Sequence, residues 1–130
     1  MLRTTDALSR PLAALLKTEK VSTSQYNVLR ILRGAPAGLP CREIGERMIS
    51  RDPDITRLLD RLERRSLVAR CRDNPDRRTV LTRITPEGRQ LLARLDAPLT
   101  GTHRRLLGHL GPQRLRSLTQ LLAACRTGGG

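Results

Sequence analysis

A helix followed directly by a charged β-hairpin, between Ile49 and Thr85, is the feature that most constrains this fold. The helix is predicted from Asp52 to about Arg65. Asp52 is a good N-cap, and Pro53 suits the first helical position because that position needs no N–H donor. A helix that can enter a groove, next to a charged β-ribbon, is a combination that proteins use to hold duplex DNA.

The hairpin is predicted from two short strand-like segments and the turn between them. Residues 67–72 and 79–85 are rich in apolar and β-branched side chains, and the sequence Asp-Asn-Pro-Asp at 73–76 favours a turn. This turn is flanked by three arginines, whose planar cations suit the narrow minor groove of DNA: Arg72, Arg77 and Arg78. A hairpin placed directly behind a helix-turn-helix predicts the wing of a winged helix.

The helix-turn-helix is predicted from the short segment before the basic helix. Pro40 or Cys41 opens a helix that ends near Met48, and a turn at 49–51 leads into the basic helix. Apolar spacing divides the basic helix into two faces. Ile55, Leu58, Leu59 and Leu62 are expected to be buried, and Thr56, Arg57 and Arg61 are expected to be exposed. An ordinary helix pair with a solvated basic face is the alternative interpretation.

Two further helices are expected before this unit. Leucines at helical spacing predict the first over residues 4–19, and Pro11 predicts that this helix is short or bent. Ser22 and Gln25 have the spacing of a capping box, which predicts the start of a second helix. Residues 35–40 are expected to form a loop because they contain two prolines and a glycine.

Two leucine-rich helices are expected after the hairpin. Thr85, Pro86 and Glu87 open the first with a cap, a proline and an acid in the first turn, and Pro98 is expected to bend it. The second begins at Gly111 and carries a long stripe of leucines. Little else in the chain can cover that stripe, which predicts a partner subunit. The alternative is that this helix folds back on the first helix of the same chain.

The expected fold is therefore mainly α with a small β-wing (α+β): a winged helix-turn-helix flanked by N- and C-terminal helices. Residues 1–130 are expected to form one domain. Its winged-helix core is placed at 20–95, its flanking helices at 1–19 and 96–126, and a disordered tail at 127–130. That both flanking helices are dimerisation helices is implied by the family resemblance given below. A chain without Phe or Trp, and with a single Tyr, must pack aliphatic side chains, which favours helices over a sheet sandwich.

The net charge of +13 favours a polyanionic partner, and for a compact domain this is more commonly double-stranded nucleic acid than a membrane. The cations are spread along the chain, so charge alone does not locate a DNA-binding face, and a general preference for arginine is an alternative explanation. No apolar run suggests a membrane span, and no signal peptide precedes the fold. Three cysteines without paired spacing indicate a reducing compartment, so we expect a cytoplasmic protein.

The DNA contacts are expected to come from the basic helix, its entrance and the wing. Arginines of the helix can pair with guanine, its threonine can touch a phosphate or a thymine methyl, and residues at the entrance can hold phosphates. Asp54 could accept from a cytosine amino group, although helix capping is the simpler role. Arg77 is expected to enter the minor groove, and Arg78 to pair with Asp76. The full set is Ser50, Arg51, Asp54, Thr56, Arg57, Arg61, Arg72, Arg77 and Arg78.

These residues resemble the MarR family of bacterial winged-helix regulators. The resemblance is carried by the capping box with Val28-Leu29, by ITRLLDRLE at 55–63, by Leu67-Val68, by Asp76-Arg77-Arg78, and by Thr85-x-x-Gly88. It covers residues 20–95 well and the ends loosely. The chain departs from the family pattern at Ser66, where the family usually has glycine, and at Thr82, which replaces a more apolar strand residue.

The resemblance implies a dimer with interlocking terminal helices, whose two basic helices enter successive major grooves of a pseudo-palindromic operator. It also implies a repressor that a small ligand releases. That ligand is expected near Tyr26 and Arg30, where Arg30 could hold the carboxylate of an aromatic acid; a core Tyr26 and a solvated Arg30 are the alternative. We expect neither an enzyme nor a bound cofactor or metal, because no catalytic pair is recognisable and His103 and His109 are poorly spaced for one helical face.

Two other function classes stay open. Cys41, Cys71 or Cys125 could make the protein a redox-sensing regulator. A winged helix could also bind DNA without strong sequence preference, as an architectural protein. Genomic footprinting separates these classes, because discrete palindromic sites indicate a regulator and broad coverage indicates an architectural protein.

Overall fold

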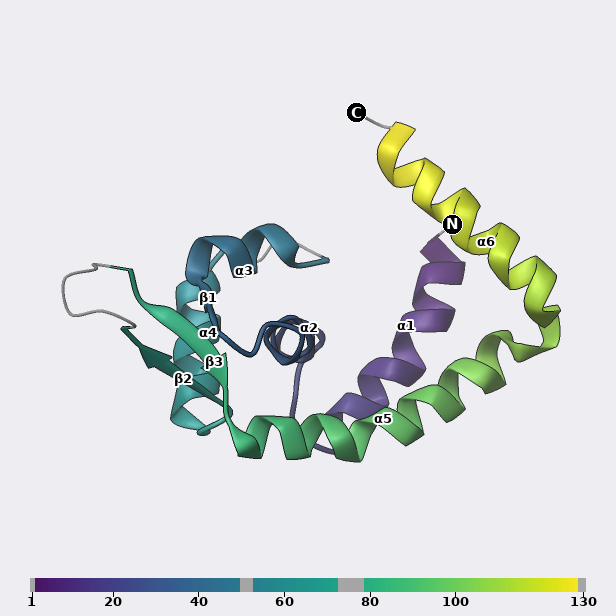
Figure 1. Cartoon of the computed structure of the whole chain (residues 1–130). Helices are drawn as coiled ribbons and strands as arrows, with labels where there is room; N and C mark the ends of the chain where they lie inside the picture. Colours follow the sequence, from purple (N-terminus) through teal and green to yellow (C-terminus); the bar gives the residue numbers. More distant parts are fainter. Residues whose placement is uncertain (1, 50–52, 73–78, 129–130) are drawn as a thin grey trace.

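Helices make up most of the molecule, and a small β-sheet projects from one end of it (Figure 1). The computed structural model describes residues 2–49, 53–72 and 79–128. In chain order the elements are α1 (Leu2–Lys17), α2 (Thr23–Arg33), β1 (Leu39–Pro40), α3 (Cys41–Arg47), α4 (Ile55–Arg64), β2 (Val68–Cys71), β3 (Leu81–Ile84), α5 (Pro86–Leu107), the 3-10 turn η1 (Gly108–Leu110) and α6 (Gly111–Gly128). The expected class, mainly α with a small β-wing, is confirmed.

The sheet has three antiparallel strands in the order β1-β3-β2, so the two strands of the predicted hairpin are neighbours. Val68 lies opposite Ile84 in the hairpin, and Leu39 of β1 lies opposite Thr82. β1 was not predicted, because it falls in the segment expected to be a loop. It has only two residues, too few for a periodic pattern, and Pro40 is tolerated because β1 is an edge strand.

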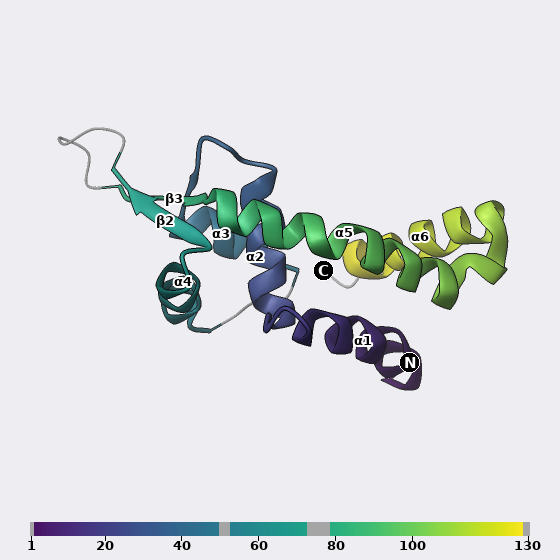
Figure 2. The same cartoon turned by 90° about the horizontal axis from the view of Figure 1, so that it is seen from below.

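The core is aliphatic, and α2 lies near its centre in both views (Figures 1 and 2). Its largest fully buried side chains include Leu29 and Leu32 of α2, Leu59 and Leu62 of α4, and Leu92 of α5. Burying one such leucine side chain contributes about 1.5–3 kcal/mol. The leucine stripe of α4 is therefore firmly anchored in this core, and the opposite face of α4 is left to solvent.

Side-chain caps begin α2 and α5 where the sequence predicted. Ser22 Oγ accepts from the N–H of Gln25 at 3.1 Å, and Gln25 Oε1 accepts from the N–H of Ser22 at 3.0 Å. The predicted capping box is thus present in full. Thr85 caps α5 by accepting the N–H of Gly88 at 3.0 Å.

The basic helix α4 begins later than expected. It starts at Ile55 with Asp54 as its N-cap, so the prediction of Asp52 as the cap and Pro53 as the first helical residue was wrong. Asp54 Oδ1 accepts from the N–H of Arg57 at 3.1 Å, which satisfies one of the donors left free in the first turn. An aspartate stands on each side of Pro53, and both are good caps, so local sequence could not choose between them.

Prolines end neither of the two long helices that contain them. α1 is one 16-residue helix through Pro11, so of the two alternatives expected, a short or a bent first helix, the short one was wrong. α5 is one 22-residue helix through Pro98 and Gly101. A proline removes only one N–H donor from the helix, and in α5 the hydroxyl of Thr102 donates an extra bond to the Pro98 carbonyl oxygen at 3.0 Å.

α6 lies at the end of α5 that is remote from the winged-helix core (Figure 2). None of its described residues is buried, and the side chains of Leu121 and Leu122 are 65% and 47% exposed. The helix continues through Thr127 and Gly128, two residues into the segment expected to be a disordered tail. The leucine stripe of α6 is therefore left uncovered within one copy of the chain.

Candidate nucleic-acid interface and ligand pocket

The outer face of α4 carries the polar side chains that the sequence singled out. Thr56, Arg57 and Arg61 are exposed, on the opposite side of the helix from its buried leucines. They line a shallow surface hollow of about 340 Å³ together with Asp54, Asp60 and Arg64. The structure thus brings three predicted DNA-contacting residues together, and it adds Arg64, which was not among the predicted contacts.

Arg70 of β2 fixes the orientation of α4 against the sheet. Its Nη2 lies 2.8 Å from Asp60 Oδ1 in an ion pair and donates to the carbonyl oxygen of Thr56 at 3.3 Å. Its backbone N–H donates to Oε2 of Glu63 at 3.2 Å. Sequence reasoning missed Arg70 because its role depends on how a strand is placed beside a helix, which no local pattern encodes.

Only part of the predicted wing and helix-entrance set lies within the described residues. Arg72 follows β2 and is exposed where the chain leaves the sheet for the hairpin tip. Ser50 and Arg51 at the helix entrance, and Arg77 and Arg78 at the tip, lie outside the described residues. Their roles stay predictions.

Thr85 and Gly88 join the wing to α5. Thr85 Oγ1 donates to the carbonyl oxygen of Ser66 at 2.6 Å, and the N–H of Thr85 donates to the carbonyl oxygen of Leu67 at 3.1 Å. A Cβ on Gly88 would collide with the same Leu67 oxygen and would lie 2.7 Å from Cγ1 of Ile84. Ser66 has a φ of 59°, the left-handed conformation that glycine adopts without strain. The Thr-x-x-Gly motif therefore holds three elements in contact: the end of α4, the sheet and the start of α5.

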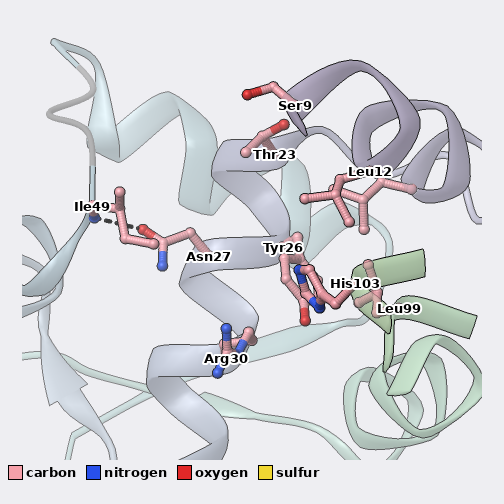
Figure 3. A pocket seen from close by; sticks show the side chains of 10 residues that line it. Ser9, Leu12, Thr23, Tyr26, Asn27, Arg30, Ile49, Leu99 and His103 are labelled. Atoms are coloured by element: carbon pink, nitrogen blue, oxygen red, sulfur yellow. Dashed lines mark hydrogen bonds between the residues drawn. The ribbon is translucent and has the colours of Figure 1, made fainter. Parts of the chain in front are cut away.

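A pocket of about 250 Å³ is bordered by α1, α2 and α5 (Figure 3). Tyr26 and Arg30, the two residues predicted to meet a ligand, both line it, and the other lining residues are Ser9, Leu12, Leu16, Thr23, Asn27, Ile49, Leu99 and His103. The Arg30 guanidinium carbon lies 5.8 Å from the centre of the Tyr26 ring, within cation–π range. His103 was not predicted here, because it comes from α5 and only the tertiary fold brings it to α2.

A more polar hollow of about 320 Å³ adjoins this pocket, and Tyr26, Arg30 and His103 are among the residues that line both. Arg33 lines only the outer hollow and is paired with Asp96, whose Oδ2 lies 2.9 Å from Arg33 Nη1. Among the described residues, Arg30 has no carboxylate partner. Its guanidinium is therefore available to an anion that enters the pocket.

Asn27 links the pocket to the segment that leads into α4. Its Oδ1 accepts from the N–H of Ile49 at 2.8 Å, and both residues line the pocket (Figure 3). The side chain of Ile49 is apolar, yet it is 84% exposed. A molecule that filled the pocket would therefore touch both partners of a hydrogen bond located shortly before α4 begins.

Two arginines hold the turn between α1 and α2. Arg65, which follows α4, donates to the carbonyl oxygens of Lys20 at 2.6 Å and Glu19 at 3.0 Å. Arg94 of α5 donates to the Glu19 carboxylate from Nε at 3.0 Å and from Nη2 at 3.2 Å. The hydrogen bond from Arg94 lowers the pKa of Glu19 below its ordinary value, and the charges of Arg94 and Arg65 act in the same direction against partial desolvation. The turn is thus fixed to both α4 and α5.

The cysteines and the possible metal ligands form no further site in the part of the chain that the structure describes. Cys41, Cys71 and Cys125 are free thiols, and Cys125 is exposed on α6. Residues 2–49, 53–72 and 79–128 contain no cluster of three histidine, cysteine or acidic side chains that could hold a metal ion. Over the same ranges, each helix is too short or too polar to cross a membrane.

The sequence and the fold are both similar to those of known transcriptional regulators. The model of the MarR family matches residues 21–80, from α2 through the hairpin tip. The chain is 37% identical to a MarR transcription factor from Planctomyces limnophilus of known structure, with a TM-score of 0.72 over 94% of this chain and 89% of that one. It is 28% identical to the PcaV transcriptional regulator from Streptomyces coelicolor, solved in complex with its natural ligand, with a TM-score of 0.80 over 98% of this chain and 92% of that one.

Two curated regulators are similar as well. The HTH-type transcriptional regulator TtmR of Methylorubrum extorquens is 38% identical over 90 residues, which are 69% of this chain and 46% of TtmR. The chain therefore spans about half the length of that relative. The homoprotocatechuate degradative operon repressor of Escherichia coli is 26% identical over 108 residues, which are 83% of this chain and 72% of the repressor.

Proposed function

We propose a specific function on the premise that this chain belongs to the MarR family of winged helix-turn-helix transcriptional regulators. In this proposal the chain is a homodimeric repressor that leaves its DNA when a small ligand binds. The family consists of DNA-binding regulators and not of enzymes. The observation that carries the DNA-binding part is the exposed polar face of α4, which Arg70 holds in a fixed orientation beside the wing.

In this proposal α4 enters the major groove with its exposed face toward the base edges. Arg57 and Arg61 pair with guanine, and Thr56 touches a phosphate or a thymine methyl. Asp54 acts as the helix cap, because its Oδ1 already accepts the N–H of Arg57. Positions at the helix entrance and in the wing supply phosphate and minor-groove contacts: Ser50, Arg51, Arg72, Arg77 and Arg78.

The uncovered leucines of α6 support a dimer. Leu121 and Leu122 leave an apolar stripe in water that a second copy of the chain would bury. Two symmetry-related α4 helices would then read a pseudo-palindrome, with half-sites about 10 bp apart. A dimer fixed across such a site blocks access to the DNA, and the similarity to the homoprotocatechuate operon repressor supports this mode of action.

The pocket beside α2 supports a small aromatic acid as the ligand. Its size of about 250 Å³ suits a substituted single ring, since a cavity of about 150 Å³ already holds benzene. Leu12, Leu16 and Leu99 supply apolar walls, and the Arg30 guanidinium is available to a carboxylate. The ligand-bound structure of the similar PcaV regulator supports a ligand-responsive function.

Release would pass through Asn27 and Ile49. A ligand that displaces the Ile49 side chain, or takes up the Asn27 amide, breaks the bond that holds the beginning of the α3–α4 connection to α2. Ligand binding and DNA binding then favour two different positions of this connection, and their coupling is reciprocal.

The experiment that tests the proposal begins with selection of bound DNA from a random pool. The selected operator is then used in gel-shift titrations of wild type, Arg57→Ala and Arg77→Ala. We expect Arg57→Ala to weaken operator binding by about 10- to 100-fold, the range for loss of one good bidentate base contact. Arg77→Ala should also weaken binding strongly with the fold intact. Arg89→Ala, at an exposed position on α5, is the matched control.

Two results would overturn the proposal. If selection yields no preferred sequence, the chain is not a sequence-specific regulator. If a panel of aromatic acids, starting with benzoate and phenylacetate, never lowers affinity for the selected operator, the ligand-release part is wrong. Arg30→Ala tests where the acid binds. This variant should respond less to the acid, and its operator affinity without the acid should equal that of wild type.

A further inference from the structure

A basic groove of about 460 Å³ opens beside α4, on the flank that does not face β2. It lies between the turn that joins α1 to α2 and the middle of α4. Three cations line it, Lys17, Lys20 and Arg61, together with the polar side chains of Ser22, Ser24 and Gln25. Arg61 also lines the hollow on the outer face of α4, so the groove borders the proposed DNA-binding surface.

Within the part of the chain that the structure describes, no carboxylate pairs with the positive charges of this groove. The chain contains only two lysines, and both lie here. No carboxylate lines the groove, and within the described residues Lys17, Lys20 and Arg61 have no ion-pair partner. The neighbouring Glu19 is engaged by Arg94 and does not compensate them. Three unpaired cations beside hydroxyl and amide groups form a site suited to a phosphate.

The groove is also held in place before any anion arrives. Arg65 binds the backbone carbonyl oxygens of Glu19 and Lys20, so the turn that carries Lys20 is attached to the end of α4. Arg94 attaches the same turn to α5 through the Glu19 carboxylate. The turn's position relative to α4 is therefore fixed before binding. Less conformational entropy is then lost when an anion binds.

We propose that this groove binds a backbone phosphate of the DNA strand that borders the major groove occupied by α4. The wing contacts the DNA on one flank of α4, and Lys17 and Lys20 bind the phosphate on the other, so that α4 is held between phosphates of both strands. Arg61 lies between this groove and the outer face of α4 and keeps its proposed contact with guanine. This inference rests on the proposed DNA binding, and it adds the α1–α2 turn to the interface. Lys17 and Lys20 would contribute affinity without sequence preference.

The test compares Lys17→Gln/Lys20→Gln with wild type on the selected operator and on a scrambled duplex across a salt series. One phosphate contact contributes about 0.9 to the slope of log affinity against log salt, so the double variant should lose up to roughly 0.9. Affinity near 0.1 M salt should fall by up to about tenfold, and equally on both duplexes. The control Arg89→Gln/Arg104→Gln removes the same charge from exposed positions of α5 and should leave the slope nearly unchanged.

A second measurement identifies the phosphate itself. Replacing single operator phosphates with neutral methylphosphonates should reveal a position that weakens wild-type binding but has no further effect on the lysine double variant. An unchanged salt slope in that variant, with thermal unfolding like that of wild type, would overturn the inference. The proposed repressor function would still stand if Arg57→Ala lost operator preference, and it would fail separately if wild type bound both duplexes alike.

Discussion

The side-chain oxygen of Asn27 accepts the N–H of Ile49 at 2.8 Å, and both residues face the pocket beside α2. We predict that in Asn27→Ala the binding of a ligand no longer changes the affinity for operator DNA. Loss of one such hydrogen bond is worth about 1 kcal/mol, so operator affinity should fall by roughly fivefold without ligand. An aromatic acid that weakens DNA binding of wild type should then have little further effect, which paired gel-shift titrations with and without the acid would measure.

Asn27→Asp is the matched control, because a carboxylate oxygen can still accept the Ile49 N–H. This variant should keep operator affinity close to that of wild type while the alanine variant does not. If both variants respond to the acid as strongly as wild type does, the Asn27–Ile49 bond does not transmit the signal.

The exposed face of α6 should hold the dimer together. Leu121 is 65% exposed in one subunit, so Leu121→Glu should leave its fold intact and place a charge in the subunit interface. We expect sedimentation to show a shift from dimer to monomer, with weaker operator binding. Gln120→Glu adds the same charge at the neighbouring position and should remain dimeric; equal dissociation of both variants would mean that net charge, and not the apolar stripe, is responsible.

Gly88 should tolerate no side chain. A methyl group there would collide with the Leu67 carbonyl oxygen, and overpacking of this kind destabilises by about 1–3 kcal/mol. Gly101, in the same helix, has open space where a Cβ would lie, so Gly101→Ala should stabilise by about 0.5–1 kcal/mol. Urea unfolding of the two variants should therefore give effects of opposite sign, and equal effects would contradict the tight contact at Gly88.

Replacing Ser66 with glycine should stabilise the fold. Its φ of 59° is unfavourable for a residue with a Cβ by about 1–2 kcal/mol, and glycine recovers part of this despite its larger unfolded-state entropy. Ser66→Gly should raise the free energy of unfolding by up to about 1 kcal/mol. Ser66→Ala keeps the strain and should not raise it, so a stabilised alanine variant would point to the lost hydroxyl instead of the backbone.

Glu19 should make stability depend on pH in acid. The pKa of its carboxyl is lowered in the folded chain, mainly by the hydrogen bond from Arg94. A lowered folded-state pKa means that the ionised form stabilises the fold above the unfolded value near 4.5, and that this stabilisation is lost as pH falls through the lower folded value. Wild type should exceed Glu19→Gln in stability at neutral pH, and the difference should disappear in strong acid when unfolding is followed at each pH.

Local chemistry determined much of what the sequence could predict. The capping box at Ser22, the cap at Thr85 and the leucine stripe of α4 each depend on residues a few positions apart, and each was confirmed. Arg70 and His103 act across elements distant in sequence, so periodicity could not find them. The start of α4 was misplaced because Asp52 and Asp54 are equivalent caps by type, and the local sequence does not distinguish them.

The uninterrupted α5 has a mechanical consequence. It is clamped to the wing at Gly88 and leads to α6 at its other end, and its 22 residues follow a curved axis about 33 Å long (Figure 1). Over a lever of at most that length, a tilt of about 6° at the α6 end displaces the wing by up to about 3.4 Å, which is roughly the rise of one base pair. In the proposed dimer, the operator spacing would therefore depend on the angle between the two α5 helices, and a small change in that angle would move α4 out of register with the DNA.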